Sequence, residues 1–244
     1  MPFPEGLQVV DHGGHQLFLL PAPVGGAEQK LLYLLDGNAA MAALRPEWLA
    51  QNPTVSIVGI GYPDTSDFDP DRRSLDYTPM PPADWDGGKR RATQRPHGGA
   101  TAFLAQLTGT ILPFAEDRLG LAAPRRAIWG HSYGGLFCLN ALAEGLASFE
   151  AMHAASPSLW WGDGALERRL LAGDITGSVN RLWLSMGGSE ISRTGEVMGS
   201  PERLTNLRQA LERVPGLHCT VGIFPQTSHG AAMARSLEHI VRSF

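Results

Sequence analysis

The chain has 244 residues, of which 43% are hydrophobic and 18% are charged, and its formal net charge is −4. This is the composition of a globular protein that can bury a sizeable core, and without a basic stripe it argues against a nucleic-acid partner. No apolar run approaches the length of a membrane span, so no membrane partner is expected. One domain over residues 1–244 is predicted, because nothing in the sequence suggests a linker or an internal repeat.

The first residues predict the compartment, and the cysteines predict the state of the thiols. Residues 1–6 contain neither a basic nor an apolar segment, so no signal peptide is expected. Cys138 and Cys219 lie in apolar segments, and we predict two buried free thiols rather than a disulfide or a metal site. The protein is therefore expected to be cytoplasmic, or periplasmic if a leader has been removed.

The first quarter of the chain is predicted to form four strands and one helix. Apolar runs at 7–10 and 17–20 flank a turn signal and predict an antiparallel hairpin at a sheet edge. The runs at 31–35 and 55–60 are continuously apolar, as in strands buried on both faces. Between them, an alanine-rich helix is expected to extend to about Ala50.

The stretch 64–97 differs from the rest of the chain. It is rich in Pro, Asp and Arg, lacks periodicity and is too long for an ordinary connection. A disordered surface loop is one interpretation. Phe68, Tyr77, Met80 and Trp85 supply apolar anchors, however, and favour an ordered insertion that covers the functional site.

Strands and helices alternate through the second half of the chain. Residues 100–119 are helical in pattern, and Pro113 is expected to kink or divide this helix. Strands are predicted at 125–128, 149–154, 181–186 and 217–224, and helices after residue 132, at 166–171, at 201–214 and at the end of the chain. This alternation predicts an α/β fold with a mostly parallel sheet and helices on both faces.

Ser132 occupies the middle of a Gly-x-Ser-x-Gly pattern between a predicted strand and a predicted helix. That context is typical of a nucleophile elbow, where a strained serine needs neighbours without Cβ atoms. The helix that follows points its N–H groups and its positive dipole end towards the place where an oxyanion would form. A glycine-rich turn that only packs a helix against a strand is the alternative.

A serine nucleophile needs a base, and His229 is the best candidate among the eight histidines. It lies on a loop after the last strand, whereas His218 and His239 fall on a predicted strand edge and on the final helix. His131, inside the elbow, is assigned a packing role. Reactive groups of open α/β sheets collect at the carboxyl ends of strands, which would bring His229 to Ser132.

Glu190 is the candidate for the acid, because it directly follows the strand that ends in Gly187-Gly188-Ser189. The order serine, acid, histidine is that of an α/β-hydrolase. A surface carboxylate is the other interpretation of Glu190, and Asp163 and Asp174 are weaker candidates.

An oxyanion hole needs two main-chain donors. One is expected from Tyr133, the residue after the nucleophile. The other is expected from the loop after the third strand, at Gly37 or Asn38.

A set of short segments resembles one known family. These are Leu34-Leu35-Asp36-Gly37-Asn38, Gly59-Ile60-Gly61-Tyr62-Pro63, Arg73 with Asp76-Tyr77-Thr78-Pro79, Gly98-Gly99-Ala100, Gly130-His131-Ser132-Tyr133-Gly134-Gly135, Ser156-Pro157-Ser158-Leu159-Trp160-Trp161 and Ser228-His229-Gly230. In this order they are similar to the bacterial siderophore esterases of the enterobactin and salmochelin type, within the broader esterase D and antigen-85 group.

The resemblance implies hydrolysis of ester bonds in catecholate trilactones, either free or as ferric complexes. It implies no cofactor, because the iron belongs to the substrate, and it selects Asn38 as the donor in the third-strand loop. Some members use a Ser–His dyad, which leaves the role of Glu190 open. A general carboxylesterase or acyltransferase, and a hydrolase-like protein that binds without turnover, are the competing functions.

The resemblance also suggests residues that bind the substrate. A ferric tricatecholate is anionic, so Arg73, with Arg72 beside it, is expected to supply a counter-charge from the insertion. Four aromatic side chains are expected either to stack on the substrate rings or to pack the insertion against the body of the protein: Tyr62, Tyr77, Trp160 and Trp161.

Overall fold

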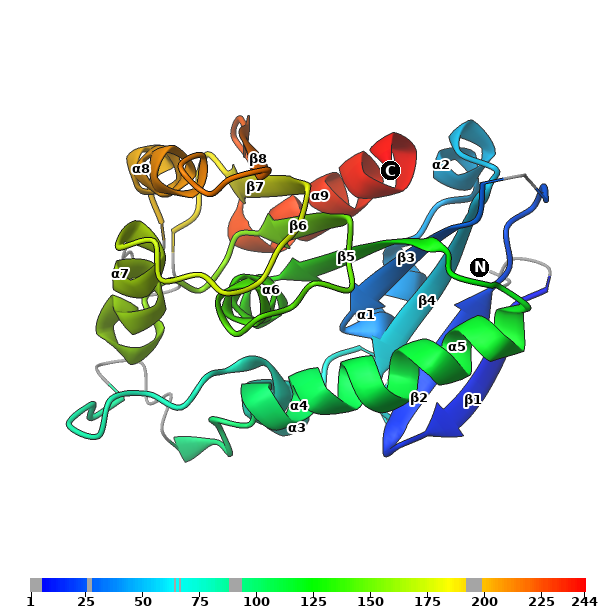
Figure 1. The fold of residues 1–244 in the computed structure, drawn as a ribbon, viewed down its shortest axis with the longest axis horizontal. Coiled ribbons are helices and arrows are strands. Elements are labelled where there is room, and N and C mark those ends of the chain that lie inside the picture. Colours follow the sequence, from blue (N-terminus) through cyan, green and yellow to red (C-terminus); the bar gives the residue numbers. More distant parts are fainter. Residues whose placement is uncertain (1–5, 26–27, 64, 66, 88–93, 192–198) are drawn as a thin grey trace.

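An eight-stranded sheet runs through the middle of the protein (Figure 1). The computed structural model describes residues 6–25, 28–63, 65, 67–87, 94–191 and 199–244. The strands are β1 (Gln8–His12), β2 (His15–Leu20), β3 (Lys30–Leu35), β4 (Val55–Gly61), β5 (Arg125–His131), β6 (Ala151–Ala155), β7 (Arg181–Gly187) and β8 (His218–Phe224). Their spatial order is β1-β2-β4-β3-β5-β6-β7-β8.

The sheet is antiparallel at one edge and parallel elsewhere. Strand β2 pairs antiparallel with β1 and β4, and all later pairings are parallel. At the carboxyl ends, His131 pairs with Ala155, and Ala155 pairs with Ser185. The loops after β5 to β8 therefore emerge side by side, at the carboxyl ends of the strands. This arrangement confirms the prediction of an α/β-hydrolase fold with an N-terminal hairpin.

Helices cover both faces of the sheet. They are α1 (Gly37–Ala43), α2 (Pro46–Gln51), α3 (Pro70–Tyr77), α4 (Ala100–Gln106), α5 (Leu112–Leu119), α6 (Tyr133–Ala143), α7 (Ala165–Leu171), α8 (Pro201–Leu211) and α9 (His229–Ser243). Helices α1, α2 and α9 enclose one apolar core, and helices α3 to α8 contribute to a larger core on the other face. Cys138 and Cys219 are buried and free, as predicted.

The alanine-rich segment after β3 forms two helices rather than the single helix expected up to Ala50. Helix α1 ends at Ala43, and Pro46 begins α2. Proline disfavours the α conformation in the residue before it, and Arg45 accordingly has an extended backbone, with φ −117° and ψ 134°. The proline therefore divides the segment.

The helical region before β5 accommodates Pro113 without a break. A π-helical turn, Leu107–Ile111, joins α4 to α5, and the Leu112 N–H donates to the Leu107 carbonyl five residues earlier. Pro113 lacks an N–H donor, and the wider turn ahead of it shifts the hydrogen-bond pattern where that donor is missing. Pro113 was expected to kink or divide the helix, and the structure shows a π turn before the proline in a continuous helical segment.

The expected insertion contains helix α3, which we did not predict. The Asp69 carboxylate caps it by accepting from the N–H groups of Asp71 and Arg72, and Pro70 is its first residue. Of the expected anchors, Tyr77 and Trp85 are buried, whereas the side chains of Phe68 and Met80 are exposed. Residues 64, 66 and 88–93 of the insertion lie outside the described residues. Within the described ranges, none of the helices is sufficiently long and apolar to cross a bilayer.

Candidate active site

Four polar side chains follow the aligned carboxyl ends of neighbouring strands. Ser132 follows β5, Ser156 follows β6, Glu190 comes shortly after β7, and His229 follows the loop after β8 as the first residue of α9. The register of the parallel strands brings residues separated by up to almost 100 positions to one edge of the sheet. Ligands of open α/β sheets bind at this edge.

Ser132 lies at a strained corner between β5 and α6. Its backbone has φ 60° and ψ −113°, a conformation that residues with a Cβ rarely adopt. Its N–H donates to the Ala155 carbonyl over 2.9 Å, and its own carbonyl accepts from the Leu136 N–H over 2.9 Å. The corner also explains Gly130, where a Cβ would lie 2.4 Å from the Gly134 carbonyl. The Gly-x-Ser-x-Gly pattern thus forms the tight turn that was predicted.

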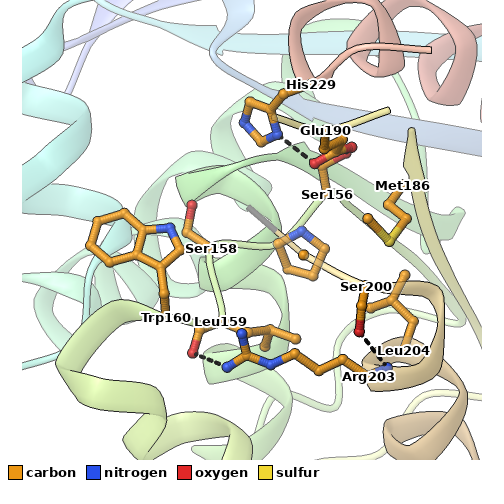
Figure 2. A pocket seen from close by; sticks show the side chains of 12 residues that line it. Ser156, Ser158, Leu159, Trp160, Met186, Glu190, Ser200, Arg203, Leu204 and His229 are labelled. Atoms are coloured by element: carbon orange, nitrogen blue, oxygen red, sulfur yellow. Dashed lines mark hydrogen bonds and ion pairs between the residues drawn. The ribbon is translucent and has the colours of Figure 1, made fainter. Parts of the chain in front are cut away.

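His229 and Glu190 form a hydrogen-bonded pair (Figure 2). The His229 Nδ1 lies 2.7 Å from Glu190 Oε2, and Glu190 is only 5% exposed. Glu190 Oε1 accepts from the Ser156 hydroxyl over 2.5 Å and from the Gly187 N–H over 2.6 Å. Burial alone would raise the pKa of Glu190, but the hydrogen bonds from these partners lower it below its usual value. The carboxylate is therefore held in its charged form.

His131 connects the elbow to the candidate base. Its Nε2 donates to the main-chain carbonyl of His229 over 2.9 Å, and the two imidazole rings lie 4.7 Å apart. Burial, together with the charges of His229 and Arg73, lowers the pKa of His131 well below its usual value. His131 is therefore neutral, and its packing role includes a hydrogen bond that holds the His229 backbone.

Ser132 and His229 line the same pocket, which we call the Ser132 pocket. Its lining residues are Phe68, Arg73, His131, Ser132, His229, Gly230 and Met233. The Ser132 Oγ lies 3.3 Å from the Ser158 Oγ. Since Nδ1 of His229 faces Glu190, Nε2 is the ring nitrogen that Glu190 does not engage.

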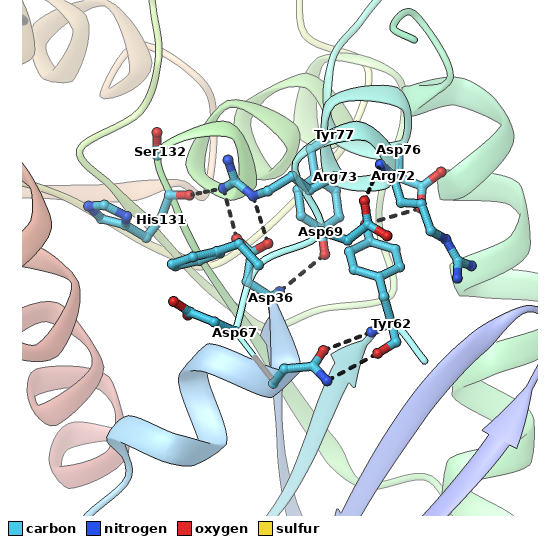
Figure 3. Close-up of polar contacts among 12 residues, drawn as sticks. Asp36, Tyr62, Asp67, Asp69, Arg72, Arg73, Asp76, Tyr77, His131 and Ser132 are labelled. Carbon is cyan, nitrogen blue, oxygen red and sulfur yellow. Dashed lines mark hydrogen bonds and ion pairs between the residues drawn. The ribbon is translucent and has the colours of Figure 1, made fainter. Parts of the chain in front are cut away.

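Arg73 forms a bidentate ion pair with Asp36 beside the elbow (Figure 3). The Nε–Oδ1 and Nη2–Oδ2 distances are 2.8 and 2.9 Å, and Nη2 also lies 3.5 Å from the His131 carbonyl. Burial disfavours the charged guanidinium, but Asp36 raises the pKa of Arg73 above its usual value. The expected counter-charge for a substrate is therefore already paired within the chain, although it still lines the Ser132 pocket.

The two expected oxyanion donors occupy different environments. Tyr133 begins α6, so its N–H belongs to the first turn, where intrahelical acceptors are lacking. Asn38 lies in the first turn of α1, and its carboxamide hydrogen-bonds the main chain of Tyr62 and the carbonyl of Thr65. Asn38 is absent from the lining of the Ser132 pocket, within the part of the chain that the structure describes.

Of the four aromatic candidates, only Trp160 lines a pocket beside the site. Tyr62, Tyr77 and Trp161 are at most 1% exposed, so a ligand cannot stack on their rings in this structure. The Tyr77 hydroxyl accepts from the Asp36 N–H, and the Trp161 indole N–H donates to the Pro79 carbonyl. Their assignment to substrate binding is corrected here, because these rings pack the insertion against the sheet.

Arg72 also differs from the expectation. Its guanidinium lies over the Tyr62 ring, 4.8 Å from the ring centre, and donates to the Gly14 carbonyl in the N-terminal hairpin. It therefore joins α3 to the hairpin and, in the described part of the chain, does not line the Ser132 pocket.

A second pocket is also lined by His229, and we call it the Trp160 pocket (Figure 2). Ser156, Ser158, Glu190 and His229 contribute polar groups, whereas its apolar lining comes from Pro157, Leu159, Trp160, Met186 and Leu204. Among the residues described, no group of three or more His, Cys, Asp and Glu side chains is placed to hold a metal ion.

Three contacts of the site were missed by sequence reasoning. They are the hydrogen bond of Ser156 to Glu190, the contact of Ser158 with Ser132, and the pairing of Asp36 with Arg73. The residues whose contacts were missed, Ser156, Ser158 and Asp36, fall within segments that carry the family resemblance, and that was the available signal. The signal could not specify which atom each side chain contacts.

Comparison with known proteins places the chain in a family. The sequence model of the "Putative esterase" family matches residues 14–210. The chain belongs to this esterase family. The predictions of an esterase and of a resemblance to siderophore esterases are confirmed.

Two curated relatives carry siderophore names. The chain is 33% identical to the apo-salmochelin esterase of Escherichia coli O6:H1 over 215 residues, which are 86% of this chain and 66% of the relative. It is 32% identical to the siderophore enterobactin esterase of Emericella nidulans over 206 residues, which are 77% of this chain and 67% of the relative. The chain thus spans about two thirds of the length of these relatives.

A solved structure supports the same fold and chemistry. The enterobactin hydrolase IroE in complex with DFP, an inhibitor of serine hydrolases, matches with a TM-score of 0.76 at 28% identity. The match covers 97% of this chain and 93% of that one.

Proposed function

We propose that this esterase hydrolyses siderophore esters with Ser132 as nucleophile, His229 as base and Glu190 as acid. One observation carries the assignment: a buried carboxylate holds Nδ1 of His229, and that histidine shares a pocket with a serine at a strained corner. A serine hydroxyl needs such a base, and the base needs an orienting group.

The reaction follows from this arrangement. Ser132 Oγ attacks the ester carbonyl while Nε2 of His229 takes its proton, and the same nitrogen then protonates the leaving alcohol. Glu190 stabilises the imidazolium that forms between these steps. A water molecule activated by His229 hydrolyses the acyl enzyme and restores Ser132.

The negative charge of the tetrahedral intermediate needs donors close to Ser132. The Tyr133 N–H is the first of these, and the Asn38 N–H remains our proposal for the second. Arg73 adds a fixed positive charge to the Ser132 pocket, with Asp36 holding its orientation. A paired guanidinium stabilises an oxyanion without having to reorganise, so we assign Arg73 to this charge as well as to an anionic substrate.

The substrate class rests on the relatives, which are named for enterobactin, salmochelin and triacetylfusarinine C. We infer a catecholate trilactone or its ferric complex, with the ester and its acyl group in the Ser132 pocket, whose volume is about 260 Å³. The Trp160 pocket has a volume of about 20 Å³, which holds little more than one water molecule. A general carboxylesterase is the second candidate, since the apolar side chains of Phe68 and Met233 in the Ser132 pocket also suit simple acyl groups.

A substrate panel tests this proposal. Ferric and iron-free trilactone siderophores and a short p-nitrophenyl ester are each incubated with the protein, and kcat/KM is measured. We expect the trilactones to be preferred and Ser132→Ala to abolish turnover of every substrate while still binding them. A preference for the p-nitrophenyl ester indicates the general carboxylesterase, and turnover by Ser132→Ala rejects the serine mechanism.

A further inference from the structure

The segment after β6 places a second serine against the candidate acid. The Ser156 hydroxyl donates to Glu190 Oε1 over 2.5 Å, and both side chains are buried. Hydrogen bonds to a charged group are shorter and stronger than those between neutral groups. This contact joins the loop after β6 to the loop after β7, at the acid itself.

The backbone of Ser156 is unusual for a serine. Its φ of 43° lies in the left-handed region, which favours glycine or asparagine. Its N–H donates to the Ser185 carbonyl over 2.6 Å, which extends the pairing of β6 with β7 by one residue. Glycine would adopt this backbone conformation with less strain, but it has no hydroxyl to donate to Glu190.

A second donor reaches the same oxygen from Gly187. The Gly187 N–H lies 2.6 Å from Glu190 Oε1. A side chain at Gly187 is excluded, because its Cβ would lie 2.1 Å from the Thr227 carbonyl in the loop that leads to His229. One carboxylate oxygen therefore accepts two donors from separate strands, and Oε2 is the oxygen that faces His229.

We propose that Ser156 is a positioning residue that fixes the Glu190 carboxylate so that Oε2 meets His229 Nδ1. This inference rests on the proposed role of Glu190 as the acid of the triad. Without Ser156 the carboxylate keeps one donor on each oxygen, from Gly187 and His229, and the second donor on Oε1 further restricts rotation about the Cγ–Cδ bond. The orientation is then set before the imidazolium forms, so no reorganisation is needed during the reaction.

The alternative is that Ser156 only links two loops. Ser156→Gly distinguishes the two roles, because glycine adopts the left-handed backbone without strain and removes only the hydroxymethyl group. A structural link predicts a change in stability with normal catalysis. A positioning role predicts normal or raised stability with a reduced kcat.

The experiment measures kcat, KM and the melting temperature of Ser156→Gly, Glu190→Gln and the double variant, with Ser132→Ala as the inactive reference. Ser156→Ala is the second single variant. We expect Ser156→Gly and Ser156→Ala to lower kcat by about tenfold with little change in KM. Glu190→Gln is expected to lower kcat by on the order of a hundredfold. The double variant should be no slower than Glu190→Gln, since Ser156 acts through the carboxylate.

Three results overturn the proposal. The first is a wild-type kcat in Ser156→Gly, and the second is full activity in Glu190→Gln. The third is a loss of kcat in the double variant that equals the product of the two single losses, because the two residues would then act independently. Failure of the proposed function is seen separately, as turnover by Ser132→Ala. If Ser132→Ala is inactive and Ser156→Gly is fully active, the nucleophile assignment holds and only the role of Ser156 is wrong.

Discussion

Arg73 is the residue whose interpretation changes most between sequence and structure. The family resemblance implies a counter-charge for an anionic substrate, whereas the structure shows a guanidinium paired with Asp36 and surrounded by the rings of Phe68, Tyr77 and Tyr133. Asp36 has a left-handed backbone, with φ 52°, at the start of α1. The ion pair thus connects the insertion to the third-strand loop and to the elbow.

Removing one partner of this pair should be costly. Arg73→Ala leaves the carboxylate of Asp36, which is 2% exposed, without its partner, and we expect a loss of about 3–5 kcal/mol in the free energy of unfolding. Arg73→Gln combined with Asp36→Asn removes both charges and is the matched control. Urea denaturation should show that the double variant regains most of the stability.

The kcat of the double variant separates the contribution of the ion pair to stability from the contribution of Arg73 to catalysis. We expect the double variant to keep a low kcat on a neutral p-nitrophenyl ester, because the positive charge beside Ser132 is gone. Normal kcat together with a raised KM for a ferric catecholate would instead assign Arg73 to substrate binding alone.

At the residue scale, the sequence predicted the candidate serine, acid and histidine, because their residue types and their order along the chain are those of an α/β-hydrolase. Ser132, Glu190 and His229 were expected at one place because strand ends collect reactive groups, and the structure places Glu190 against His229 and His229 in one pocket with Ser132. The burial of Tyr62 and Tyr77 was not found, because an aromatic ring has the same sequence signal in a core and in a binding site. Only the packing of α3 against the sheet separates the two cases.

At the element scale, strand β6 carries a buried histidine that the mechanism does not use. His153 is 1% exposed, and its Nε2 lies 2.8 Å from the Ser185 hydroxyl. Burial, together with the charge of His239, lowers the pKa of His153 to about 3. The unfolded chain binds a proton here below about pH 6.5, whereas the folded chain does not until about pH 3.

Stability should therefore fall as the pH drops from about 6.5 towards 3, because only the unfolded state gains this proton. We expect His153→Gln to reduce the pH dependence of the unfolding free energy by an amount approaching 1.4 kcal/mol per pH unit near pH 5. His131 and His239 are present in both proteins, so the comparison isolates His153 and its coupling to them. Urea titrations at pH 7, 6 and 5 measure it, and equal slopes for both proteins would refute the buried neutral state.

The elements themselves were predicted unevenly, for physical reasons. Continuous apolar runs identified the buried strands, because a strand covered on both faces has this pattern. Helix α3 was missed because eight residues with few apolar side chains show no periodicity, although Asp69 and Pro70 are a helix-start signal. The π turn before Pro113 has no signal beyond the proline.

At the scale of the whole molecule, the parallel register explains why distant residues form one site. The loops after β5, β6, β7 and β8 emerge at the carboxyl ends of the strands. Those after β6, β7 and β8 supply the hydrogen-bonded side chains of Ser156, Glu190 and His229, and Ser132 after β5 shares a pocket with His229. The alternation of strands and helices was enough to predict this end of the sheet. It was not enough to predict which pocket admits a substrate, because that depends on how the insertion packs.

The most direct test of the account is the site at which a fluorophosphonate labels the protein. After treatment with DFP, intact mass and peptide mapping should show one adduct, on Ser132. Labelling should be absent in Ser132→Ala and slower by about a hundredfold or more in His229→Ala, which lacks the base. An adduct on any other residue, or continued labelling of Ser132→Ala, would contradict Ser132 as the nucleophile.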